Sequence, residues 1–169
     1  GGYETGSVVD FSETYRYTPK VNEWDLKKFQ SVLNSWPDHV PAVFVSFDKG
    51  GAGKSLPKQN ADAQKLFEKY RKHLHNFLLK PTRQCRGALS DTIKLLQPHI
   101  KKLGNFHIIG VTEKELGRTM LDRMETVAKL RRLLDDAGIR SPMQVFGALD
   151  PLSSCLYFLA GAEIFAGLT

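Results

Sequence analysis

Polar residues able to bind a ligand or move a proton stand at the ends of several short apolar runs in this chain. They are Asp48, Lys80, Thr82, Thr112, Glu113 and Asp150. A carboxylate can accept hydrogen bonds from two N–H donors at once, and two carboxylates can divide the acid and base roles of a reaction. If the apolar runs lie side by side, this spacing predicts that the polar residues gather at one site.

The apolar runs have the composition of buried β-strands. Five of them recur along the chain: Val40–Asp48, Asn76–Thr82, Phe106–Glu113, Met143–Asp150 and Glu163–Thr169. Amphipathic stretches long enough for helices separate them, and such alternation is typical of parallel βα units. In these folds the ligand site lies at the carboxyl ends of the strands. The sequence therefore predicts a single α/β domain over 1–169, with its site at that edge.

Helical periodicity predicts the elements that must position these strands, at 19–36, 60–75, 88–103 and 118–137. Asn60 is expected to cap the second helix, and Pro98 to kink the third or end it early. Residues 112–117 are expected to form a polar loop. Asp150 has two interpretations, as a site carboxylate or as the N-cap of a short helix that begins at Pro151.

Composition and charge narrow the classes of protein. The chain has 41% hydrophobic and 25% charged residues, and no run of about 18 apolar residues that would predict a membrane span. No secretory leader is expected, and the start at Gly1 suggests a piece of a longer protein. Cys85 and Cys155 do not form a zinc motif, which favours a reduced, cytoplasmic compartment. The formal charge of +6 is compatible with a polyanionic partner or with an ordinary basic surface. A basic helix segment, Lys129–Arg132, has the same two interpretations.

The glycine-rich segment Lys49–Ser55 resembles the phosphate-binding loop of ParA/MinD-type ATPases. That resemblance implies that Lys54 and the loop amides cradle phosphates and that Ser55 binds magnesium. Pro57 argues against it, because proline disfavours helical dihedrals at the preceding residue. The alternative is a basic surface loop before a helix that starts later.

A second resemblance spans nearly the whole chain. Gly1-Gly2-Tyr3-Glu4 resembles the end of the Asp-Ser-Gly-Gly-aromatic motif of tRNA-guanine transglycosylases, and four later segments follow in the order of that family. They are Val43–Asp48, Phe106–Val111, Met143–Gly147 and Gly161–Leu168. The chain is most similar to a divergent branch that includes 7-deazaguanine DNA-modification enzymes. The resemblance implies a partial TIM barrel containing roughly the last five parallel strands and their helices. It places the zinc subdomain of the family beyond Thr169, so no cofactor is expected here.

The resemblance also assigns roles to individual residues. Tyr3 would stack on the base, Asp48 would bind its Watson–Crick edge, and the backbone at Gly110 would approach it closely. The rest of the pocket would be formed by Lys80, Thr82, Val111, Thr112, Glu113 and Gly147. The alternatives are a locally packed tyrosine at Tyr3, a capping carboxylate at Asp48 and a turn glycine at Gly110.

The implied reaction exchanges guanine for a 7-deazaguanine base in tRNA or DNA through a covalent glycosyl-enzyme. The nucleophile of the family is an aspartate, and Ala166 occupies its position in this chain. An alanine side chain has no atom that can attack carbon, so the chain is expected to be inactive as it stands. A non-catalytic module that binds nucleic acid or a protein partner remains the alternative. A homodimer or a partner subunit could cover the open edges of a partial barrel.

Overall fold

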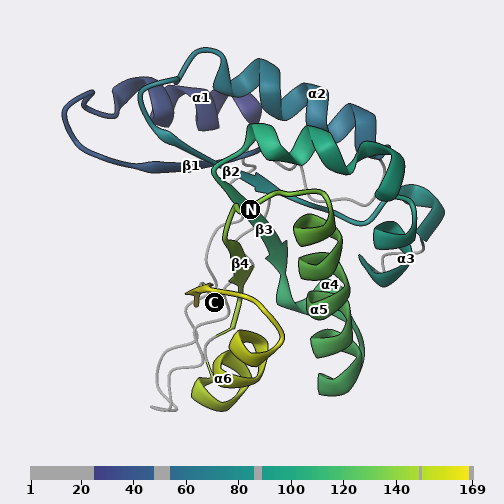
Figure 1. Cartoon of the computed structure of the whole chain (residues 1–169). Coiled ribbons are helices and arrows are strands. Elements are labelled where there is room, and N and C mark those ends of the chain that lie inside the picture. The colour runs from purple at the N-terminus through teal and green to yellow at the C-terminus, as the bar shows by residue number, and fades with distance from the viewer. Residues whose placement is uncertain (1–24, 48–53, 86–88, 149, 168–169) are drawn as a thin grey trace, which may run out of the picture.

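In the part of the chain that the structure describes, five parallel strands form one sheet in which each strand pairs with its neighbour in sequence. The computed structural model describes residues 25–47, 54–85, 89–148 and 150–167. The strands are β1 (Val43–Val45), β2 (Leu74–Leu78), β3 (Ile108–Thr112), β4 (Met143–Phe146) and β5 (Ile164–Ala166), in the order β1-β2-β3-β4-β5. The sheet is curled into a half-barrel and alternates with helices (Figure 1). The predicted partial α/β barrel is therefore confirmed.

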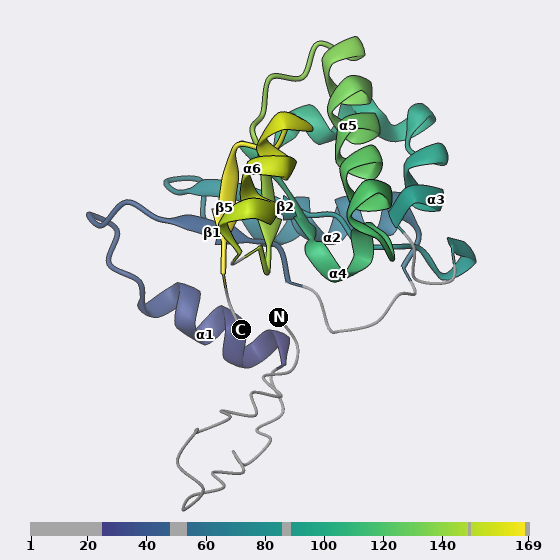
Figure 2. The same cartoon turned by 90° about the horizontal axis from the view of Figure 1, so that it is seen from below.

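The helices supply the outer layer of this half-barrel. The α-helices are α1 (Leu26–Ser35), α2 (Leu56–Phe67), α3 (Leu89–Lys94), α4 (Glu113–Leu116), α5 (Met120–Asp136) and α6 (Pro151–Leu159). Among the described residues, two 3₁₀ segments flank α3: η1 (Arg83–Cys85) precedes it and η2 (Gln97–Asn105) follows it. Viewed from below, α3 and α5 lie on the same side of the sheet (Figure 2). The connections from strand to helix to parallel strand are those expected of βα units.

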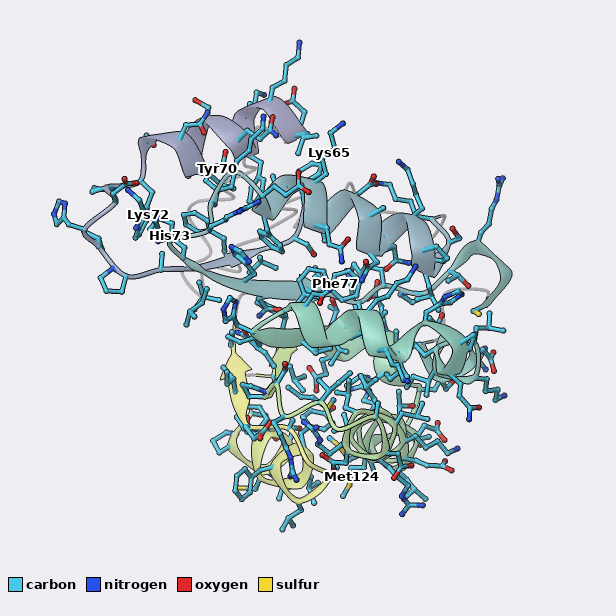
Figure 3. The ribbon with its side chains drawn as sticks, turned by 45° about the horizontal axis from the view of Figure 1, so that its top comes forward. Lys65, Tyr70, Lys72, His73, Phe77 and Met124 are labelled. Atoms are coloured by element: carbon cyan, nitrogen blue, oxygen red, sulfur yellow. The ribbon has the colours of Figure 1, made fainter. Side chains whose placement is uncertain are left out.

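The strands alternate between a face buried under the helices and an inner face. Phe77, Ile109 and Val145 are almost completely buried in the core, and Phe77 lies between the sheet and the helix layer in Figure 3. Phe44 of β1 is buried in the same core. Since successive side chains of a strand alternate, residues an odd number of positions away point to the inner face. Val43 and Leu74 are two of these, and they are paired in register and remain well exposed.

Several predicted boundaries are wrong, and α2 explains most of the differences. This helix begins at Leu56 and ends at Phe67, so Asn60 lies inside it, where its side chain is buried and donates weakly to Lys102 O (3.4 Å). Pro57 favours the early start, because the first turn of a helix needs no N–H from it. Because α2 ends at Phe67, the strand β2 can begin at Leu74. His75 therefore lies in a strand, and Pro81 and Thr82 lie beyond its end.

The other boundaries agree with the sequence predictions only in part. The helix expected over 88–103 divides into α3 and η2 around Pro98, as that proline predicted. The expected polar loop at 112–117 is instead a helical turn, α4, anchored by the fully buried Leu116. Thr119 and Asp122 form a capping box at the start of α5. Across the described ranges, no helix combines the length and apolarity needed to cross a bilayer.

Candidate functional site at the carboxyl edge

Lys80 connects the ends of β2 and β3. Its amino group donates to Thr112 Oγ1 (3.1 Å) and to the carboxylate of Glu115 (2.9 and 3.0 Å). Both members of the ion pair are mostly buried, with side-chain exposures of 16% and 20%. Burial of this degree makes the pair less sensitive to salt than a surface pair. Two residues expected in the base pocket, Lys80 and Thr112, are thus in direct contact.

Glu113 forms a second polar group beside the first. Its Oε1 accepts a hydrogen bond from the hydroxyl of Tyr157 (2.8 Å) and lies 3.3 Å from an Arg123 guanidinium nitrogen. Arg123 also donates through Nε to Gly117 O (3.1 Å), which fixes the guanidinium. Burial, reinforced by the hydrogen bond to Glu113, raises the pKa of Tyr157 to about 12. The phenol is therefore a proton donor at any physiological pH.

Gly147 and Ala166 bring the ends of β4 and β5 next to Glu113. Gly147 has a positive φ of 89°, and a Cβ built on it would lie 3.8 Å from Glu113 Cβ. Its amide donates to Ala166 O (2.6 Å), and Ala166 is paired in register with Phe146. The backbone of Ala166, the position of the expected nucleophile, is therefore bonded to a glycine that lies beside Glu113.

Gly110 lies one strand away, on the inner face. A Cβ there would lie 2.6 Å from Asn76 Oδ1 and 2.8 Å from Phe146 Cε2. The two neighbouring strands therefore leave no room for a side chain at this position. Asn76 is fully buried and donates to Gln144 Oε1 (2.6 Å), but none of the described residues donates to its Oδ1. Glycine at this position is thus explained by packing inside the barrel.

The remaining predicted residues have other surroundings. The Val111 side chain is fully buried in the core, so only its backbone could face a ligand. Thr82 is buried, and its hydroxyl donates to Cys85 Sγ (3.1 Å). Asp150 caps α6 by accepting from the amide and hydroxyl of Ser153 (2.7 and 2.8 Å), and these bonds lower its pKa. Tyr3 and Asp48 lie outside the described residues.

The start of α2 bears on the phosphate-loop interpretation. The helix does begin directly after Ser55, so the objection based on Pro57 is wrong. However, the amino group of Lys54 is bound to Asp62 (2.7 Å), and Ser55 makes no capping hydrogen bond. A small pocket lies between this end of α2 and the tips of β1 and β2, lined by Ser46, Lys54, Gln59, Asp62 and Lys80 among others. Residues 49–53 of the loop lie outside the described part of the chain.

Sequence reasoning missed Arg123 and Tyr157. Both lie in helices of ordinary amphipathic composition, where nothing in the spacing distinguishes a residue that faces the strand ends. Tyr157 is completely buried, whereas its apolar neighbours Phe158 and Leu159 are largely exposed, the reverse of what hydropathy predicts. Within the described residues, no three His, Cys, Asp or Glu side chains are grouped closely enough to hold a metal ion.

We compared the chain with protein-family models, with curated proteins and with solved structures, and found no match to any of them.

Proposed function

We propose that this chain is the base-binding part of a transglycosylase-like barrel that handles guanine and 7-deazaguanine bases in nucleic acid. The carrying observation is the arrangement at the carboxyl edge. Lys80 and Thr112 are in contact there, and Glu113 lies beside Gly147, whose amide donates to Ala166 O. This edge is where parallel α/β folds bind their ligands. Fixed carboxylate and ammonium groups there suit a ligand edge that carries both donors and acceptors.

The proposed chemistry requires a nucleophile that the chain lacks. In base exchange, a carboxylate oxygen bonds to the anomeric carbon while the glycosidic C–N bond breaks, and guanine leaves with the bonding electrons and takes a proton. The ring nitrogen of an incoming 7-deazaguanine then attacks the same carbon, loses its proton and releases the carboxylate. Ala166 cannot perform the first step. The chain is therefore expected to bind base without exchanging it.

Nucleic acid as the partner is supported by the charge of the surface near this edge. The chain carries a formal charge of +6. The exposed Arg83 and the partly buried His99 line a groove with Ser55, between the start of α2 and η2. Phosphate contacts made by such residues would weaken as salt is raised. Whether the polymer is tRNA or DNA is decided by comparing the two in the binding assay below.

Calorimetric titration with 7-deazaguanine tests the base-binding step. Wild-type protein should bind it, whereas Glu113→Gln should bind at least about tenfold more weakly, as expected for the loss of a charged acceptor. Adenine is the control ligand, and Glu125→Gln is the matched control variant, because it makes the same change at an exposed position on α5. Equal binding of guanine-type bases and adenine by the wild type would contradict the proposal.

The exchange step is tested with Ala166→Asp. Incubation with a guanine-containing tRNA or DNA should yield a covalent protein–nucleic acid adduct and release guanine, both of which can be followed on denaturing gels with labelled substrate. The wild type should give neither product. Base binding without an adduct in Ala166→Asp would favour the non-catalytic binding module.

A nucleotide-hydrolase function is the second candidate, and the start of α2 directly after Ser55 favours it. It requires Lys54 to leave Asp62 and to contact phosphates. Binding of ATP that is lost in Lys54→Met would support this alternative. Under the base-binding proposal, ATP should not bind, and Lys54→Met should leave affinity for 7-deazaguanine unchanged.

A further inference from the structure

Glu113 is held in place by two helices other than its own. Tyr157 comes from α6 and Arg123 from α5, and both donate to the same carboxylate oxygen, Oε1. No described residue donates to Oε2, and the Glu113 side chain keeps 21% of its surface exposed. One oxygen of this carboxylate is thus committed to the protein, and the other is available at the carboxyl edge of the sheet.

The two donors differ in what they supply. Arg123 supplies a charged donor, and its own position is fixed by the hydrogen bond from Nε to Gly117 O. Tyr157 is fully buried and supplies a neutral donor that cannot be replaced by water without opening the core. The other acidic residue of α4, Glu115, faces away from this pair and binds Lys80.

We propose that Tyr157 and Arg123 are positioning residues that hold the Glu113 carboxylate in one orientation, with Oε2 directed toward an N–H donor of the ligand. The nature of that ligand, a guanine-type base, rests on the function proposed above. The orientation itself rests only on the contacts among the three side chains. Both residues act through Glu113 and need not touch the base.

A ligand-free measurement tests the orientation directly. The mobility of the Glu113 side chain is measured by ¹³C NMR relaxation, at one fixed pH, in the wild type, Arg123→Met, Tyr157→Phe and the control Glu125→Gln. Glu125 lies on α5 as well, but is exposed and paired with Lys129. Removing either donor should increase the mobility of the Glu113 side chain, because Oε1 then loses one of its two fixed partners, while the control should leave that mobility unchanged. An unchanged mobility of the Glu113 side chain in both Arg123→Met and Tyr157→Phe overturns the proposal.

Binding of 7-deazaguanine tests the consequence for the ligand. Tyr157→Phe and Arg123→Met should each weaken binding about fivefold to tenfold, and Arg123→Lys should recover most of the loss because it keeps the charge. If the wild type binds and both variants bind equally well, the positioning role fails while the proposed function stands. If the wild type does not bind but the Glu113 side chain becomes more mobile in both variants, the proposed function fails while the positioning role stands. Should Tyr157→Phe fail to fold, the comparison of Arg123→Met with Arg123→Lys decides between these outcomes.

Discussion

Gly110, on the inner face of the sheet, has no room for a side chain. Gly110 is closed in by Asn76 Oδ1 and by the ring of Phe146, both nearer than 3 Å to the place of a Cβ. Gly110→Ala should therefore destabilise the protein by about 1–3 kcal/mol through overpacking. Gly104→Ala is the matched control, because its Cβ would meet only Ile139 at an ordinary contact distance of 3.5 Å. Urea unfolding measures the difference in stability between the two variants. Equal stabilities would show that the inner face can accommodate the added methyl group.

Near the amino-terminal end of β2, His75 makes the stability of the fold depend on pH. Figure 3 shows Tyr70, Lys72 and His73 gathered before the start of β2, and His75 follows them, stacked on Phe67 at 4.3 Å with its Nε2 donating to Tyr70 O (2.9 Å). Burial is the main cause that lowers the pKa of His75 from 6.5. The folded state therefore favours the neutral ring, so the unfolded chain binds more protons below that value and stability falls as the pH decreases through it.

His75→Phe should remove part of this pH dependence while keeping the stacked ring. The loss of thermal stability between about pH 7.5 and about pH 5.5 should be smaller in this variant than in the wild type. His39→Asn, a change at an exposed position, should keep the wild-type loss. A variant that loses as much stability as the wild type would show that His75 does not carry the effect.

At the scale of elements, Arg131 ties α5 to the segment that leads into β4. Its guanidinium donates to Ile139 O (2.7 Å) and Ser141 O (2.9 Å) and pairs with Asp135. The basic segment 129–132 therefore divides between a structural residue and a solvated one, Arg132, rather than forming one face. Arg131→Met should cost about 1–3 kcal/mol, because two carbonyls lose their donor. Arg132→Met is the control and should be near neutral, and denaturant midpoints of the two compare them.

The parts of the fold that could be predicted are those whose sequence signals are local. The five apolar runs and Pro98 act within a few residues, and the strands and the break between α3 and η2 were predicted from them. The start of α2 was missed because Pro57 is compatible both with ending a loop and with opening a helix. The pairing of Glu113 with Tyr157 spans 44 residues. Contacts of this kind depend on how helices pack, which no local pattern encodes, so only part of the candidate site could be predicted.

At the scale of the whole molecule, the inner face of the half-barrel is the unusual surface. Parallel sheets are generally covered on both faces, yet Val43 and Leu74 are 43% and 47% exposed on this one. Weak self-association that increases with protein concentration is therefore expected. Val43→Lys should reduce it in sedimentation experiments, because a charge on that face must stay hydrated. Leu121→Lys, at an exposed site on α5, should not change it. The reverse ranking would assign the association to the helices.

The strictly consecutive strand order has a consequence for how the chain reaches its native state. Every strand finds its partner in the next βα unit, so no pairing has to wait for a segment made much later. Loop closure between neighbours carries a modest entropic penalty compared with joining distant segments. Units can accordingly dock one after another as the polypeptide emerges during synthesis, each using the previous strand as its template.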